Sequence, residues 1–314
     1  MKILVTGAAG FVGSHTAQRL HALGHEVIGV DNFSDYYDVS IKQDTANDLL
    51  KDGIPIITLD LRQAESYNLL AADFDYIFHF AAQPGISSSS TFDQYLSNNL
   101  IATQLLLEFA LKNTHLKQFI NIATSSVYGL HAFFDENKPT MPASHYGVTK
   151  LAAEQLVLAL SRSGKLCSTS LRLYSVFGPR ERPDKLYPIL IDAALKNKPF
   201  SLFEGSEKHL RSFTFVEDIV DGIVSVIGKE EIVNGEIFNL GTEVELTTQE
   251  GIETVQALLN KKIAIQVVPK RAGDQLRTKA VIDKARKLLD YHPKTSLKQG
   301  LEKHIEWYLS KLNQ

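Results

Sequence analysis

The chain has 314 residues, of which 44% are hydrophobic and 22% charged, and its 33 Lys and Arg against 36 Asp and Glu give a net charge of −3. This length and composition suit a globular protein with one large core or two smaller ones. The charge balance lacks the positive excess that nucleic acid or an anionic membrane requires, so neither is an expected partner. A single cysteine, Cys167, no apolar run that spans a bilayer and no signal-like N-terminus predict a cytoplasmic location.

Short runs of β-branched and aromatic residues recur along the first half of the chain, separated by segments long enough for helices. The predicted strands lie at 3–6, 27–31, 56–59, 76–80 and 119–123, and helices are expected at 98–112, 147–161 and 248–259. This alternation is typical of parallel strands joined by helical crossovers. We therefore expect an α/β fold with a Rossmann-type doubly wound parallel sheet and a second, smaller α/β lobe.

The rhythm of strands and helices changes after Arg172, where glycines and prolines interrupt the chain and charged helical segments follow. We expect a first domain over 1–172 and a second lobe over 173–314, with a segment of about 213–241 returning to the first domain. No flexible linker separates the two parts. The cleft between them is the natural ligand site, and no metal site is expected.

A glycine-rich turn follows the first predicted strand and opens a helix. Gly7, Gly10 and Gly13 have the spacing Gly-x-x-Gly-x-x-Gly, and Asp31 ends the second strand 18 residues after Gly13. Such glycines allow a tight turn and let backbone N–H groups approach a pyrophosphate. The Asp31 carboxylate can accept from an adenosine ribose and would repel a 2′-phosphate, which favours NAD over NADP. A glycine-rich turn without a ligand is the alternative.

Tyr146 and Lys150 are four residues apart on a predicted helix, so both lie on one face with the ammonium near the phenol. A nearby positive charge would lower the pKa of the phenol and make Tyr146 a candidate base for a sugar hydroxyl. A chain of this composition contains about one Tyr-x-x-x-Lys pair by chance, so position must supply the specificity. The pair follows the strand that ends at Thr124, which can share the proton with Tyr146 or merely cap the next turn.

Gly7, Gly10, Gly13, Asp31, Thr124, Tyr146 and Lys150 together resemble the extended short-chain dehydrogenase/reductase family, specifically its nucleotide-sugar epimerases, over nearly the whole chain. The resemblance implies that Tyr146 and Lys150 also contact NAD. It further implies cofactor contacts from Phe11, Val12, Asn32, Asp60, Leu61, Phe80, Ala81, Ala82, Gln83, Asn99 and Tyr174.

The same resemblance implies a UDP-sugar substrate. Arg211 and Arg271 would hold its diphosphate and Asp274 its ribose, because guanidinium groups pair bidentately with phosphate oxygens. The remaining implied substrate contacts are Ser87, Thr124, Ser125, Ser126, Ser175, Arg182 and Thr278. Two positions depart from the family pattern: Ser212 stands where an Asp commonly follows the diphosphate arginine, and Ser175 replaces an Asn.

Ser125 and Ser126 stand where dehydratase and decarboxylase relatives carry carboxyl groups, so epimerisation without elimination is favoured. The segments 31–40 and 178–184 resemble the UDP-glucuronate 4-epimerase branch. Arg182 would neutralise the sugar carboxylate, or instead pair with Glu181 or Asp184. UDP-glucose 4-epimerases share a similar Arg-Pro-Asp run, and the small Thr278 does not decide between the sugars.

The expected reaction inverts carbon 4 of a UDP-sugar, most simply UDP-glucuronate to UDP-galacturonate, through a transient 4-keto sugar. A UDP-glucose 4-epimerase, a dehydratase or decarboxylase, a net oxidoreductase and a non-catalytic NAD-binding protein are the alternatives. The helices at 98–112 and 147–161 are apolar on more than one face. The second face would pair with another copy in a homodimer, as in the family, or lie under the second lobe.

Overall fold

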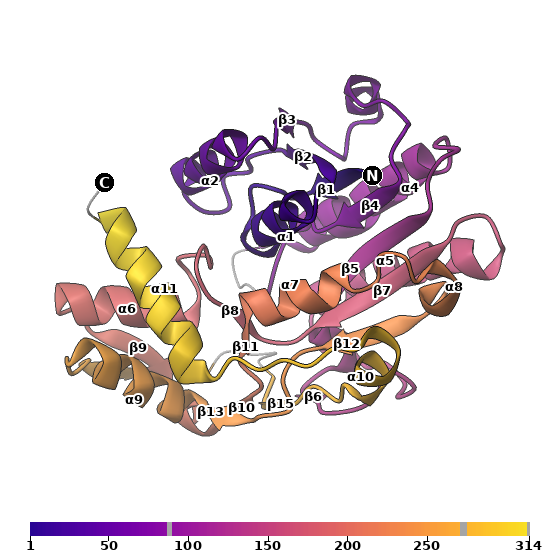
Figure 1. The fold of residues 1–314 in the computed structure, drawn as a ribbon. Helices are drawn as coiled ribbons and strands as arrows, with labels where there is room; N and C mark the ends of the chain where they lie inside the picture. The colour runs from indigo at the N-terminus through magenta and orange to yellow at the C-terminus, as the bar shows by residue number, and fades with distance from the viewer. Residues whose placement is uncertain (87–89, 271–274, 313–314) are drawn as a thin grey trace.

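A seven-stranded parallel sheet forms the larger lobe of the computed structural model, which describes residues 1–86, 90–270 and 275–312 (Figure 1). Its strand order is β12-β7-β5-β4-β1-β2-β3, so the order reverses between β1 and β4. Ligands of open α/β sheets bind at such a switch point, beyond the carboxyl ends of the strands. The strands are β1 (Lys2–Thr6), β2 (Glu26–Asp31), β3 (Ile56–Thr58), β4 (Tyr76–His79), β5 (Gln118–Thr124), β7 (Ser168–Leu173) and β12 (Ile237–Leu240).

Helices cover both faces of this sheet, as is usual for parallel sheets. Successive side chains of a strand point to opposite sides, so each strand contributes to both buried faces. Ile3 and Val5 of β1 pack into one apolar cluster with α1 and α7, whereas Leu4 packs into another with α4 and α5. The helices of the larger lobe are α1 (Phe11–Ala22), α2 (Val39–Lys51), α3 (Phe92–Tyr95), α4 (Ala102–Ala110), α5 (His145–Arg162), α7 (Val216–Val224), α8 (Glu230–Val233) and α10 (Asp283–Leu289). A π-helical turn over Leu96–Ile101 joins α3 to α4.

The smaller lobe has its own apolar cluster, which α6 (Leu186–Lys196), α9 (Thr248–Leu259) and α11 (Leu297–Leu312) share. Its short strands form a four-stranded sheet and two pairs, β8–β11 and β9–β14. They are β6 (His131–Ala132), β8 (Val176–Phe177), β9 (Phe200–Phe203), β10 (Leu210–Arg211), β11 (Thr214–Phe215), β13 (Leu246–Thr247), β14 (Ile265–Val268) and β15 (Arg277–Thr278). Figure 1 shows α7, β12 and α10 against the large sheet, although they follow the first segments of the smaller lobe.

The predicted fold class is confirmed, and the five predicted strands match β1 to β5. The helix expected at 98–112 is wrong at its start, because the helical segment begins at Phe92. Thr91 and Gln94 form a capping box there, which satisfies the first free N–H groups of the helix. Within the described residues, no helix is long and apolar enough to cross a bilayer, and no group of His, Cys, Asp and Glu is arranged to hold a metal ion.

Candidate active site

A cavity of about 650 Å³ runs from the glycine-rich turn of the larger lobe to β9 of the smaller one. Most of the residues expected to bind ligands line it. They are Gly7, Gly10, Phe11, Val12, Gly13, Asp31, Asn32, Asp60, Leu61, Phe80, Ala81, Ala82, Gln83, Thr124, Ser125, Ser126, Tyr146, Lys150, Ser175, Arg182 and Arg211. Ser87, Arg271 and Asp274 lie outside the described residues.

The glycine-rich turn is shaped for close approach of a ligand to the backbone. Gly7 has a φ of +67°, and a Cβ there would lie 2.8 Å from the backbone nitrogen of Ala81. A Cβ at Gly13 would lie 2.3 Å from the Gly7 carbonyl oxygen. Gly10 caps α1 without a side-chain hydrogen bond, so the first N–H groups of the helix face the cavity as an anion site. These residues fit the pyrophosphate of a dinucleotide.

Asp31 is held rigidly at the end of β2. Its carboxylate accepts hydrogen bonds from the backbone N–H groups of Ala9 at 3.1 Å and Phe33 at 2.9 Å. Burial raises the pKa of this carboxyl, whereas these bonds and the Lys42 ammonium oppose the rise. An acid in this place fits the ribose of NAD and disfavours a 2′-phosphate.

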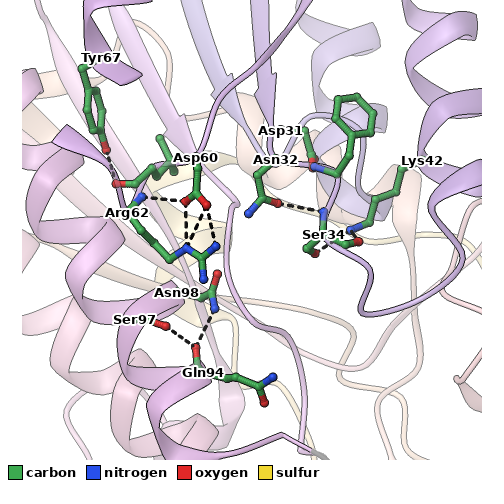
Figure 2. A network of polar contacts seen from close by, with 12 residues as sticks. Asp31, Asn32, Ser34, Lys42, Asp60, Arg62, Tyr67, Gln94, Ser97 and Asn98 are labelled. Carbon is green, nitrogen blue, oxygen red and sulfur yellow. Dashed lines mark hydrogen bonds and ion pairs between the residues drawn. The ribbon is translucent and has the colours of Figure 1, made fainter. Parts of the chain in front are cut away.

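An ion pair that the sequence did not predict lies at the same end of the cavity. Arg62 donates to both carboxylate oxygens of Asp60, at 2.9 Å from Nε and 2.6 Å from Nη2 (Figure 2). The guanidinium lowers the pKa of Asp60, and the Asn32 side chain adds to this effect. Both members of the pair line the cavity, so Arg62 belongs with the expected contact Asp60 in the adenosine region.

Three expected ligand contacts lie behind the cavity lining. Asn99 is 1% exposed and Thr278 is fully buried, with its hydroxyl 3.3 Å from that of Ser175. Tyr174 is fully buried beside Tyr128 in the core. In this structure these three side chains support the residues of the lining and do not reach the cavity.

The candidate base, Tyr146, lines this cavity, to which both lobes contribute residues. Burial raises the pKa of Tyr146, and the groups that oppose this rise most are the Thr124 hydroxyl, the Arg182 guanidinium and the Gly85 N–H. Lys150 Nζ instead donates to the Ile122 carbonyl at 2.6 Å, and burial lowers the pKa of this lysine to about 8. Arg182 thus joins Thr124 among the groups that lower the pKa of this phenol, whereas the Lys150 ammonium is held by a backbone carbonyl.

Arg182 has polar partners on two sides. Its Nε lies 3.2 Å from the Asp184 carboxylate, and its Nη1 donates to the Pro84 carbonyl at 3.2 Å. The pairing with Asp184 that was open at the sequence level is confirmed. The guanidinium also stacks over the Tyr36 ring, 5.0 Å from its centroid, and faces the cavity.

The far end of the cavity is lined by residues that the sequence reasoning missed. They come from α6 and the residue before it, from β9 and from the segment after β10, and they are Lys185, Leu186, Tyr187, Phe200, Ser201, Phe203 and Phe213. Their apolar residues look like ordinary core positions in the sequence, so no local signal marked them. Aromatic rings and two cations, Lys185 and Arg211, suit a nucleoside diphosphate at this end.

The comparison with protein families decides which group this arrangement belongs to. The model of the NAD dependent epimerase/dehydratase family matches residues 3–241. The chain belongs to this family. It is 39% identical over all of its length to YtcB of Bacillus subtilis, described as an uncharacterised UDP-glucose epimerase, of which it covers 99%. It is also 34% identical to UDP-glucuronate 4-epimerase 4 of Arabidopsis thaliana, with 98% of this chain and 75% of the relative aligned.

Solved structures of family members have the same fold. The UDP-glucuronic acid 4-epimerase of Bacillus cereus, in complex with UDP-glucuronic acid and NAD, is 34% identical with a TM-score of 0.91, over 99% of this chain and all of that one. The UDP-glucose 4-epimerase of Thermotoga maritima with UDP-glucose is 27% identical with a TM-score of 0.88, over 99% of this chain and all of that one. The likeness extends through both lobes.

Proposed function

We propose that this protein is an NAD-dependent isomerase that inverts carbon 4 of a UDP-sugar, with UDP-glucuronate and UDP-galacturonate as its substrate pair. The observation that carries the proposal is the position of Tyr146. Its side chain lines one cavity together with the glycine-rich turn and Asp31, which fit a dinucleotide, and with Lys185 and Arg211, which suit a nucleoside diphosphate. Relatives that contain NAD and UDP-glucuronic acid support the same assignment.

The side chains of this chain would manage the proton while the cofactor manages the electrons. Gly7, Gly13 and Asp31 would hold NAD, which supplies a reversible hydride acceptor for carbon 4. Tyr146 takes the proton of the 4-hydroxyl and later returns it, and Thr124 shares this proton as a hydrogen-bond partner. Between these two steps the sugar is a 4-ketone. Reduction of this ketone on its opposite face would give the inverted alcohol.

The residues beside Thr124 favour epimerisation over elimination. Ser125 and Ser126 line the cavity and carry no carboxyl group that would act as acid or base there. A 4-keto glucuronate is a β-keto acid that loses carbon dioxide readily when its carboxylate is free to align for the loss. Arg182 would bind that carboxylate and hold it away from this geometry. UDP-glucose is the second candidate substrate, because YtcB carries that description.

Turnover of UDP-glucuronate tests the function directly. The pure protein with NAD is incubated with UDP-glucuronate, and the sugar is followed by proton NMR. Formation of the galacto isomer without free reduced cofactor supports the proposal. Release of carbon dioxide, accumulation of reduced NAD, or conversion of UDP-glucose but not UDP-glucuronate contradicts it. A protein with no turnover on UDP, dTDP and GDP sugars would be an NAD-binding protein without this activity.

The homodimer and the cytoplasmic location belong to the same proposal. Apolar side chains of the π-helical turn, its continuation and α5 are exposed in the single chain: Ile101 by 40%, Leu111 by 45%, Val148 by 44% and Leu156 by 36%. Two copies would bury them in a four-helix arrangement. Light scattering at micromolar concentration is expected to give a dimer, and a monomer would reject this part. The location rests on the single Cys167.

A further inference from the structure

The Arg182 guanidinium belongs to the segment between β8 and α6, but two loops of the larger lobe hold it. Its Nη1 donates to the carbonyl of Pro84, in the loop after β4, at 3.2 Å. Its Cζ lies over the ring of Tyr36, in the loop after β2, 5.0 Å from the ring centroid. The arginine is 8% exposed and lines the cavity. The two loops that carry expected cofactor contacts therefore also hold a side chain expected to bind the substrate.

A count of hydrogen-bond donors shows what the guanidinium has left for a ligand. A guanidinium carries five N–H groups, one on Nε and two on each terminal nitrogen. The Asp184 carboxylate lies 3.2 Å from Nε of Arg182 and accepts from Nη2 at 3.3 Å, and Pro84 takes one N–H of Nη1. Within the described residues, at least one N–H therefore remains on each terminal nitrogen. Donors on both nitrogens can pair with the two oxygens of a carboxylate.

The Tyr36 ring holds the guanidinium without using any of these donors. A cation over an aromatic face is attracted by the π-electrons of the ring, and Arg forms such contacts more often than Lys. The donors of a guanidinium lie in its plane, so contact through its face leaves them to other partners. A hydrogen-bonding side chain in the place of Tyr36 would instead occupy an N–H that a ligand can use. The ring is thus suited to fix the position of Arg182 and keep its donors available.

The loop that carries Tyr36 is braced on both sides of this residue. The Asn32 side chain accepts from the Ser34 N–H at 3.1 Å (Figure 2). Lys42 of α2 donates to the Ser34 carbonyl at 2.6 Å and to its hydroxyl at 2.9 Å. The same ammonium lies over the ring of Tyr37, 4.6 Å from its centroid. The ring under the guanidinium is therefore carried by a fixed segment, just after the acid expected to hold the cofactor ribose.

We propose that Tyr36 is a specificity-determining residue: its ring holds the Arg182 guanidinium so that N–H groups on both terminal nitrogens stay available to the carboxylate of a UDP-sugar acid. The proposal deepens the proposed function and rests on its assignment of the sugar carboxylate to Arg182. A sugar with a hydroxyl group on carbon 6 brings no negative charge to this place. The ring should therefore matter for UDP-glucuronate and much less for UDP-glucose.

The test is the dissociation constant of each UDP-sugar, measured by calorimetry on NAD-bound protein that carries Tyr146→Phe to prevent turnover. Tyr36→Leu is expected to lower the preference for UDP-glucuronate over UDP-glucose about 3- to 10-fold, the range that one cation–π contact accounts for. Tyr36→Phe keeps a ring under the guanidinium and should retain the preference. In a protein that already carries Arg182→Ala, Tyr36→Leu should change the preference by less than about 1.5-fold, because the contact is lost in both.

Phe133→Leu is the matched control for removing a ring under an arginine. The Cζ of Arg277 lies 4.9 Å from the centroid of the Phe133 ring, and neither residue lines the cavity. This variant is expected to leave the preference unchanged. Tyr36→Met, a second side chain without a ring, replaces Tyr36→Leu in the same measurement if the leucine variant does not fold.

Four outcomes would overturn the role of Tyr36. They are an unchanged preference in Tyr36→Leu, an equal loss in Tyr36→Phe, an equal loss in Phe133→Leu, and a loss that persists in the Arg182→Ala protein. The last would mean that the ring contacts the sugar without acting through the arginine. Binding measured in this way is separate from turnover. A protein that binds UDP-glucuronate through Arg182 and does not convert it would contradict the proposed reaction but keep this role for Tyr36.

Discussion

Lys150 Nζ donates to the backbone carbonyl of Ile122 at 2.6 Å, near the carboxyl end of β5, and the lysine residue as a whole is 4% exposed. Burial lowers the pKa of this lysine to about 8. A charge kept in such a place costs stability, because desolvation of an ammonium outweighs one hydrogen bond to a carbonyl. Its position at the lining of the cavity indicates that function retains it.

Lys150→Met is therefore expected to lower turnover while leaving the fold at least as stable. The loss of turnover should be about 10²-fold or more, since an ammonium that lines the cavity and is expected to contact NAD is removed. At pH 7 the free energy of unfolding should equal or exceed that of the wild type, by up to about 3 kcal/mol. Urea denaturation measures the stability, and exposed Lys165→Met is the control. A clearly destabilised variant would contradict the inference that the buried lysine is retained for function and not for stability.

The same variant has a defined pH dependence. The unfolded chain keeps the Lys150 proton up to its ordinary pKa of 10.5, whereas the folded protein loses it near 8. Between these values the unfolded state binds more protons, so wild-type stability rises with pH relative to the variant. The advantage of Lys150→Met should be constant below pH 8 and shrink as pH rises toward 10. An advantage that grows in that range would exclude the assigned direction.

Arg182→Ala is expected to change the choice of substrate as well as the rate. Loss of the guanidinium removes a charged partner for a sugar carboxylate, so the ratio of kcat/KM for UDP-glucuronate over UDP-glucose should fall about 10- to 100-fold. Both rates should also fall, because Arg182 supports the Tyr146 phenol. Arg180→Ala is the matched control: that arginine donates to Gln18 of α1 at 2.7 Å and does not line the cavity. An unchanged ratio would show that Arg182 does not bind the sugar carboxylate.

A buried ion pair anchors α5 to the sheet, and breaking it should be severe. Arg172 of β7 and Glu154 of α5 meet at 2.6 Å, with side chains 2% and 0% exposed, and Arg172 also donates to the Tyr128 hydroxyl. Glu154→Gln leaves a buried guanidinium without its counter-ion, at a cost of about 3–5 kcal/mol. Glu236→Gln breaks a half-exposed pair with Lys284 and should cost less than about 1 kcal/mol. Equal losses of stability in the two variants would show that burial of an ion pair does not determine the cost of breaking it.

The parts of the site that sequence reasoning found are those set by short-range spacing. Gly7, Gly13 and Asp31 are fixed by the strand, turn and helix they belong to, so their pattern implies their geometry. The start of the helical segment at Phe92 also had a readable signal, because Thr91 and Gln94 have the spacing of a capping box. The expected start at residue 98 followed the apolar pattern alone and missed this signal.

Other features depend on contacts between distant elements, which one sequence does not reveal. β6 pairs with β15 across about 146 residues of chain, and each strand has only two residues, too few for a periodic pattern. The partner of Lys150 is a backbone carbonyl on another element, so side-chain spacing along α5 gave no indication of it. The Gly85 carbonyl is held in the same way by the Tyr95 hydroxyl, which belongs to α3.

Glu181 should make the protein less stable as pH rises through neutrality. Its carboxyl is buried among residues of the cavity, its Oε2 has no partner within the described part of the chain, and burial raises its pKa to about 8. The ordinary pKa is 4.5, so between pH 4.5 and 8 the unfolded chain loses a proton that the folded protein keeps, and stability falls with rising pH.

Glu181→Gln removes this titration. Its free energy of unfolding should match the wild type near pH 4.5 and exceed it by at least about 1 kcal/mol at pH 8. Urea denaturation at pH 5, 7 and 8.5 measures the difference in free energy of unfolding between the variant and the wild type, with exposed Glu302→Gln as the control. A difference that stays constant over this range would show that Glu181 is ionised throughout and would contradict the prediction.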